Sequence, residues 1–108
     1  MDLESIEEDI VAAAVDDPRA RTVLLVSDVE SREVEYAIIK PLQDSLQTGS
    51  TAILQGQFQT WVLVKRFCKG AVPGPGNVIV DRFERWSITN VTRAYGGLVF
   101  QCSCVLQQ

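Results

Sequence analysis

Short apolar runs with the two-residue period of β-strands fill most of this chain, and they constrain its fold more than any other feature. Residues 22–29 are β-branched and apolar, and residues 33–40 alternate so that Val34, Tyr36 and Ile38 share one face. The polar residues between the two runs favour a hairpin turn. The pattern therefore predicts antiparallel strands that follow one another along the chain.

The middle of the chain gives the longest strand signal. Residues 42–50 indicate a loop or a single helical turn, and residues 51–67 follow as an extended apolar run. Gly56 lies inside this run, where a glycine usually marks a bulge or a sharp bend. A strand of this length is far longer than the usual five or six residues. We therefore expect either a strongly coiled strand or a break between two strands near Gly56.

The last third of the chain is predicted to form two strands after a loop. Residues 70–76 are rich in glycine and proline and indicate a surface loop. Residues 77–89 predict one strand, although its pattern of apolar residues changes midway. Residues 98–106 predict a final strand, whose inner face is formed by Leu98, Phe100, Cys102 and Cys104.

An acidic amphipathic helix precedes the strands. Leu3, Ile6 and Ile10 recur at helical spacing within residues 2–15, and Pro18 ends the helix. Most of the remaining helix surface is carboxylate, so we expect the helix to be stabilised by docking its apolar stripe. That stripe can dock on the strands of its own chain or on another chain. The second alternative makes Leu3, Ile6 and Ile10 candidate partner-binding residues.

One helix and five or six strands in 108 residues fit a single domain. We predict a mainly β (α+β) fold, in which an acidic helix over residues 1–17 precedes a small antiparallel five- to six-stranded barrel over residues 20–108. No apolar run reaches the roughly 18–20 residues that a membrane-spanning helix needs. The acidic N-terminus also lacks the basic start of a signal peptide. We therefore expect an intracellular protein without a membrane partner.

The three cysteines agree with that compartment. An odd number is unusual for the disulfide framework of a secreted domain. Cys102 and Cys104 share a strand face and could bind a soft metal, but a structural zinc site needs four ligands. The only other cysteine is Cys68, and the chain has no histidine. We therefore favour buried free thiols, and we predict no metal and no cofactor.

The absence of histidine also limits catalysis. Histidine is the commonest general base, and both Ser–His–acid and Cys–His arrangements require it. The carboxylates lie mostly in the N-terminal helix and the first hairpin, where a solvated acidic face explains them. We therefore expect no enzymatic activity and assign no catalytic residue.

Charge and aromatic residues are distributed unevenly. Residues 1–44 carry twelve acids and four bases, whereas residues 45–108 carry six bases, two acids and seven of the eight aromatic residues. The asymmetry indicates either a mixed solvated surface or a basic binding face. Cations that hold phosphates and rings that stack on bases suit single-stranded nucleic acid. The candidate nucleic-acid-binding residues are Trp61, Lys65, Arg66, Lys69, Arg82, Arg85, Trp86 and Arg93.

A family resemblance points in the same direction. Residues 49–56, Gly-Ser-Thr-Ala-Ile-Leu-Gln-Gly, resemble a strand of the oligonucleotide/oligosaccharide-binding (OB) barrel, in which one glycine opens the strand and a second bends it. Residues 78–88, reached through the glycine–proline loop, are similar to the last barrel strand in small subunits of single-strand DNA-binding and telomere-capping complexes. The resemblance implies an OB-like barrel, membership of a multiprotein complex, single-stranded DNA as a ligand and a nuclear location.

These observations support two main functions. The first is a non-enzymatic small subunit of a multiprotein complex, whose barrel associates with a larger subunit or with itself. The second is a binder of single-stranded nucleic acid, and the two can coexist. A net charge of −4 opposes free-standing phosphate binding, so a stand-alone interaction or adaptor module without nucleic acid is the alternative. We also expect the acidic helix to lie over the basic half and to compete with polyanions.

Overall fold

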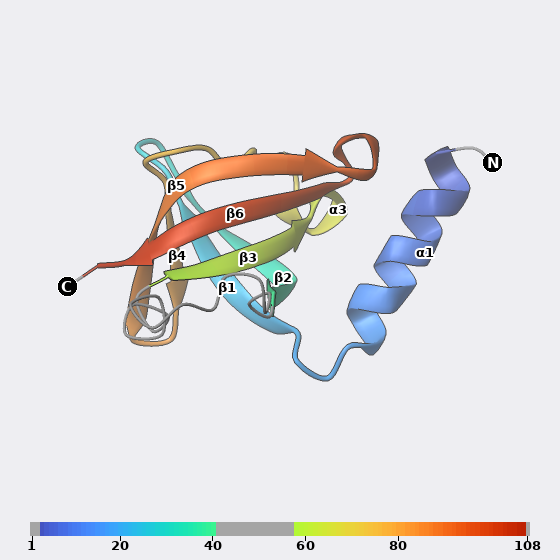
Figure 1. The fold of residues 1–108 in the computed structure, drawn as a ribbon, viewed down its shortest axis with the longest axis horizontal. Helices are drawn as coiled ribbons and strands as arrows, with labels where there is room; N and C mark the ends of the chain where they lie inside the picture. The colour runs from blue at the N-terminus through green and yellow to red at the C-terminus, as the bar shows by residue number, and fades with distance from the viewer. Residues whose placement is uncertain (1–2, 41–57, 108) are drawn as a thin grey trace, which may run out of the picture.

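The computed structural model describes residues 3–40 and 58–107. Within these ranges the chain forms a closed barrel of six antiparallel strands with an N-terminal helix beside it (Figure 1). The predicted fold class is therefore confirmed. The predicted loop at residues 42–50, the bend near Gly56 and the OB-like residues 49–56 lie outside the described residues.

The described elements are short and follow one another closely. Their bounds are α1 Leu3–Asp16, β1 Arg21–Val26, β2 Ser31–Lys40, β3 Phe58–Val64, α3 Lys65–Cys68, β4 Val78–Asp81, β5 Glu84–Ala94, the 3₁₀ turn η3 Tyr95–Gly97 and β6 Val99–Leu106. The predicted helix and final strand are confirmed to within one or two residues.

Closure of the barrel pairs every described strand with two neighbours. The order around the barrel is β1-β2-β3-β6-β5-β4, and β4 returns to β1 through pairs such as Leu25↔Ile79. This architecture is compatible with an OB-like fold, although it has one strand more than the five-stranded OB barrel. A closed barrel protects its strand edges. A partner is therefore expected to use side chains on this barrel rather than to add a strand to it.

Strand β2 departs from the predicted alternation because it contains a bulge. Val34 and Ala37 are both fully buried although they lie three residues apart. The register against β1 shifts between them, and Tyr36 has a φ of 58°. A bulge turns the residues that follow it to the opposite face. Ala37 therefore faces the core, while the ring of Tyr36 packs against Phe67, with centroids 4.9 Å apart.

The prediction of one strand over residues 77–89 is wrong, because these residues form the hairpin β4–β5. Asp81 pairs with Glu84, so Arg82 and Phe83 alone form the turn between the strands. Arg82 adopts a φ of 57°, which reverses the chain within two residues. The midway change in the apolar pattern therefore marks a turn. Residues 65–67 likewise belong to the helical turn α3 and do not continue β3.

The barrel interior forms the hydrophobic core. All four residues predicted for the inner face of the final strand are buried. Three of them, Phe100, Cys102 and Cys104, pack with buried side chains from the other strands, including Val23, Leu25, Val34, Trp61, Leu63, Ile79, Trp86 and Ile88. Because every strand contributes to one cluster, the barrel is expected to unfold as a single unit.

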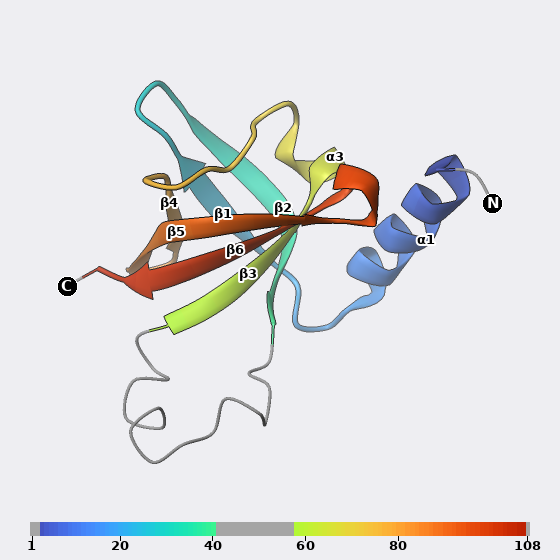
Figure 2. The same ribbon diagram turned by 45° about the horizontal axis from the view of Figure 1, so that its top comes forward.

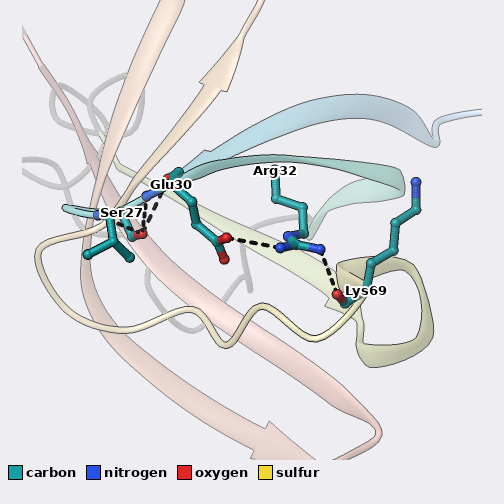
Figure 3. Close-up of polar contacts among 5 residues, drawn as sticks. Ser27, Glu30, Arg32 and Lys69 are labelled. Atoms are coloured by element: carbon teal, nitrogen blue, oxygen red, sulfur yellow. Dashed lines mark hydrogen bonds and ion pairs between the residues drawn. The ribbon is translucent and has the colours of Figure 1, made fainter.

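A polar network holds α3 against the first hairpin (Figure 3). Arg32 of β2 donates through Nη1 to the carbonyl oxygen of Lys69 at 2.8 Å, and its Nη2 lies 2.9 Å from Glu30 Oε2. Ser27 Oγ closes the β1–β2 turn by accepting from the Glu30 amide at 3.3 Å. Lys69, at φ 55°, ends α3, where carbonyls lack intrahelical partners. Arg32 therefore supplies the missing donor and fixes where α3 lies.

Candidate interaction cleft

The two tryptophans predicted to stack on nucleic-acid bases lie in the barrel core. Trp61 is 0% exposed and Trp86 is 1% exposed, and neither indole N–H has a hydrogen-bond partner within the described ranges. A ring with no exposed face cannot stack on a base. The assignment of Trp61 and Trp86 to a nucleic-acid site is therefore wrong. Their polar sequence neighbours belong to the outer faces of the same strands, since successive side chains alternate.

The six predicted cations are exposed, but they fall into two groups. Arg82 and Arg85 lie at the β4–β5 turn, whereas Arg93 lies near the opposite end of β5. The strand rise separates Arg85 from Arg93 by roughly 25 Å. Val64 and Ala94 both pair with Val99, and this places the second group around α3. That group consists of Lys65, Arg66, Lys69 and Arg93. Figure 1 shows α3 and the β4–β5 turn at opposite ends of the barrel.

Carboxylates of the same chain already engage the cations around α3. Arg66 Nη2 lies 3.3 Å from Glu7 Oε1 of α1, and Lys69 Nζ lies 3.8 Å from Glu35 Oε1. The guanidinium of Arg93 lies over the ring of Phe100, 5.8 Å from its centroid. The acidic helix thus contacts one of the predicted bases, as expected. Competition with polyanions stays a prediction.

Helix α1 lies beside the outer face of its own barrel (Figure 2). Side chains of the helix and of the barrel line a cleft between them. Ala14 is buried there, while Ile6 and Ile10 are half-buried. The cleft has a volume of about 480 Å³. Its walls are Ile6, Asp9, Ile10, Ala13, Ala14 and Asp17 on the helix side, and Ile38, Val62, Val64, Tyr95, Val99 and Gln101 on the barrel side. The predicted apolar stripe is therefore only partly covered; the side chain of Leu3 lies outside the described part.

The helix wall of the cleft is acidic. Helix α1 carries five carboxylates and no base. Asp17, just beyond the helix, accepts a side-chain hydrogen bond from Arg19, which lowers the pKa of the Asp17 carboxyl. Asp9 makes no ion pair with any described residue. The cleft thus combines apolar walls with an excess of negative charge.

The opposite end of the barrel presents an exposed aromatic ring. Phe83 is fully exposed, at 101%, in the two-residue turn of the β4–β5 hairpin. Asp81, at the base of the turn, is 5% exposed and accepts a hydrogen bond from Arg21 Nη1 at 2.9 Å. We refer to residues 82–85, Arg-Phe-Glu-Arg, as the β4–β5 tip. Sequence reasoning missed Phe83 as a surface residue because it placed the ring inside a continuous strand.

The three cysteines are buried free thiols, as the sequence predicts. Burial raises the pKa of Cys68 to about 11 and the pKa values of Cys102 and Cys104 to about 12. These thiols therefore stay protonated near neutral pH, where only the thiolate is nucleophilic. Within residues 3–40 and 58–107, no group of three potential ligands is placed to hold a metal ion. None of the described helices is long and apolar enough to cross a membrane.

Comparison with known proteins gives no match to any family model, curated protein or solved structure. The candidate site is therefore defined by the geometry of the chain's own residues. The acidic, apolar cleft lies beside α1, and the basic tip with its exposed ring lies at the other end of the barrel.

Proposed function

We propose that this protein is a non-enzymatic interaction module that binds a basic, apolar segment of a partner protein in the cleft between α1 and the barrel. The observation that carries the proposal is the cleft itself, with about 480 Å³ of space between two apolar walls. That volume falls in the range of about 300–1,000 Å³ that is typical of binding clefts. The module is proposed to act as a small subunit of a multiprotein complex.

Half-covered apolar side chains on both walls support a protein ligand. Ile6 and Ile10 on the helix and Ile38 and Val62 on the barrel are each only partly buried. A contiguous apolar patch of this kind is typical of an interaction site. An amphipathic segment could bury these side chains further, as it does in groove-binding complexes.

The negative charge of the cleft determines which kind of partner segment binds best. Of the five carboxylates of α1, Asp9 lines the cleft, and the same helix carries no base. Complementary charge speeds encounter and disfavours partners of the same sign. A segment that places Lys or Arg beside its apolar side chains is therefore the expected ligand, and an acidic segment is disfavoured.

Single-stranded nucleic acid is the second candidate ligand, at the β4–β5 tip. The observation in its favour is the fully exposed Phe83 between Arg82 and Arg85, because a ring and two cations can contact a base and its phosphates. The OB-like barrel supports this role by analogy alone. The buried tryptophans and the net charge of −4 favour the protein partner.

A designed peptide tests the cleft. The probe is a helical peptide of about 18 residues with a leucine face and a lysine face, titrated into isotope-labelled protein. We expect salt-sensitive binding, with amide shifts at Val62 and Val64. The same peptide with glutamate for lysine should bind at least tenfold more weakly. A labelled single-stranded oligonucleotide, titrated in parallel, should perturb Phe83 if the second candidate is right.

Two alanines of α1 provide matched variants for this experiment. Ala13→Phe fills the cleft and should weaken peptide binding at least tenfold, whereas Ala12→Phe adds the same ring to an exposed position that does not line the cleft. Equal affinities of the two variants, or no peptide binding by the unmodified protein, would contradict the proposal.

A further inference from the structure

We infer that the occupant of the cleft is the β4–β5 tip of a second copy of this chain, so that copies associate head to tail. The inference rests on the proposed function of the cleft and commits it to one ligand. Phe83, the most exposed aromatic ring of the described residues, is the side chain that enters the cleft.

The tip and the cleft are chemically complementary. The tip offers an exposed ring together with Arg82, Glu84 and Arg85, so its net charge is +1, and neither arginine forms an ion pair within the described ranges. The cleft offers apolar walls beside Asp9, which is likewise unpaired there. Seating Phe83 between the walls would bring both arginines toward the acidic helix. Aromatic and arginine side chains are the ones that most often dominate binding energy at protein interfaces.

The base of the tip is held in place before any partner arrives. Asp81 is buried and bonded to Arg21 at 2.9 Å, and its pairing with Glu84 leaves a turn of only two residues. Arg82 holds a φ of 57°, which is unfavourable for a residue with a side chain. Such conformations often occur at binding sites. A preorganised ring loses little freedom when it binds.

A single molecule cannot fill its own cleft. The cleft lies against Val64 and Val99 near α3, whereas the tip extends beyond the far end of β5, as Figure 1 shows. Contact between the two surfaces therefore requires two molecules. Because the two surfaces differ, the contact is heterologous, and each added copy presents a new tip and a new cleft. The contact area of one side chain and its neighbours is small, so the association is expected to be weak and concentration-dependent.

Two surface variants test the inference. Phe83→Ser removes the ring and keeps the cleft, and Ala13→Phe fills the cleft and keeps the tip; both positions are exposed, and circular dichroism checks their folding. We expect sedimentation velocity of the unmodified protein to show species that grow with concentration and shrink at high salt. Each variant alone should stay monomeric. Ala12→Phe should behave like the unmodified protein.

Mixing the two variants gives the sharpest outcome. An equimolar mixture should form a 1:1 dimer and stop there, because one functional tip meets one functional cleft and no further surface remains. A mixture that stays monomeric, or self-association that both variants retain, overturns the inference. If the unmodified protein stays monomeric while the lysine–leucine peptide still binds, self-docking is wrong and the proposed function of the cleft stands. If the peptide fails as well, both are wrong.

Discussion

Cys68, Cys102 and Cys104 show how the surroundings of a residue set its chemistry. Each thiol is an ordinary weak acid in an unfolded chain, with a pKa near 9.0. Inside the barrel, burial disfavours the thiolate and raises the three pKa values to between about 11 and about 12. The side chains therefore serve the core as small apolar groups. Folding thus couples their protonation to stability.

Raising the pH from about 8 to about 10.5 should lower the free energy of unfolding. At about pH 7 the thiols are almost entirely protonated in both states and contribute almost no pH dependence. Above pH 9 they ionise in the unfolded chain but stay protonated in the folded one, so the unfolded state is favoured. Urea midpoints measured across this range test the prediction. Cys102→Ala removes one of the three groups and should make the decline shallower; an unchanged slope would count against it.

Helix α1 has only one buried side chain among its described residues. Ala14 is buried, but Ile6 and Ile10 are half-exposed, and one ion pair, between Glu7 and Arg66, ties the helix to α3. An isolated helix of 14 residues is marginal in water. The helix is therefore expected to depend on the barrel, whereas the barrel core contains no side chain of α1 among its described members.

Ala14→Glu should detach α1 and leave the barrel folded. The substitution places a carboxylate at a buried position of the helix, where burial of an unpaired charge is costly. Hydrogen exchange should show α1 amides losing protection while β3 and β6 amides keep theirs. Ala12→Glu, on the exposed side of the same helix, should leave α1 protected. Loss of protection in the barrel strands of Ala14→Glu would show that the helix is needed for the barrel.

The whole molecule depends on the seam where the barrel closes. Strand β4 meets β1 through three register pairs, Leu24↔Val80, Leu25↔Ile79 and Val26↔Val78. Residues from all six strands share one core cluster. Opening this short seam would expose the cluster to water, so closure and core formation are expected to occur in a single cooperative step.

Ile79→Ala should lower the free energy of unfolding by about 2–5 kcal/mol, since it leaves a cavity in the core beside the seam. Leu24→Ala, at an exposed position of the same seam, should cost less than about 1 kcal/mol. Urea unfolding should give coincident transitions by tryptophan fluorescence, which reports the core, and by far-ultraviolet circular dichroism. Separate transitions would contradict a single cooperative barrel.

Local patterns determined much of the fold. Helical spacing of Leu3, Ile6 and Ile10 located α1, apolar runs located β1 and β3, and alternation located β6, because these signals depend on neighbours a few residues away. The same patterns failed at Tyr36 and at Arg82, where a positive φ introduced a bulge and a turn. Neither residue type signals such a conformation, since glycine or asparagine usually occupies it.

The candidate site was harder to predict from the sequence than the fold was. The sequence by itself determined that basic residues are interleaved with several aromatic residues in the second half, and that the N-terminal helix is acidic with an apolar stripe. Only the tertiary structure decided that Trp61 and Trp86 point inward while Phe83 points outward. The physical reason is that alternation shows which residues share a face, whereas the pairing of strands far apart in sequence, β1 with β4, decides which face becomes the inside.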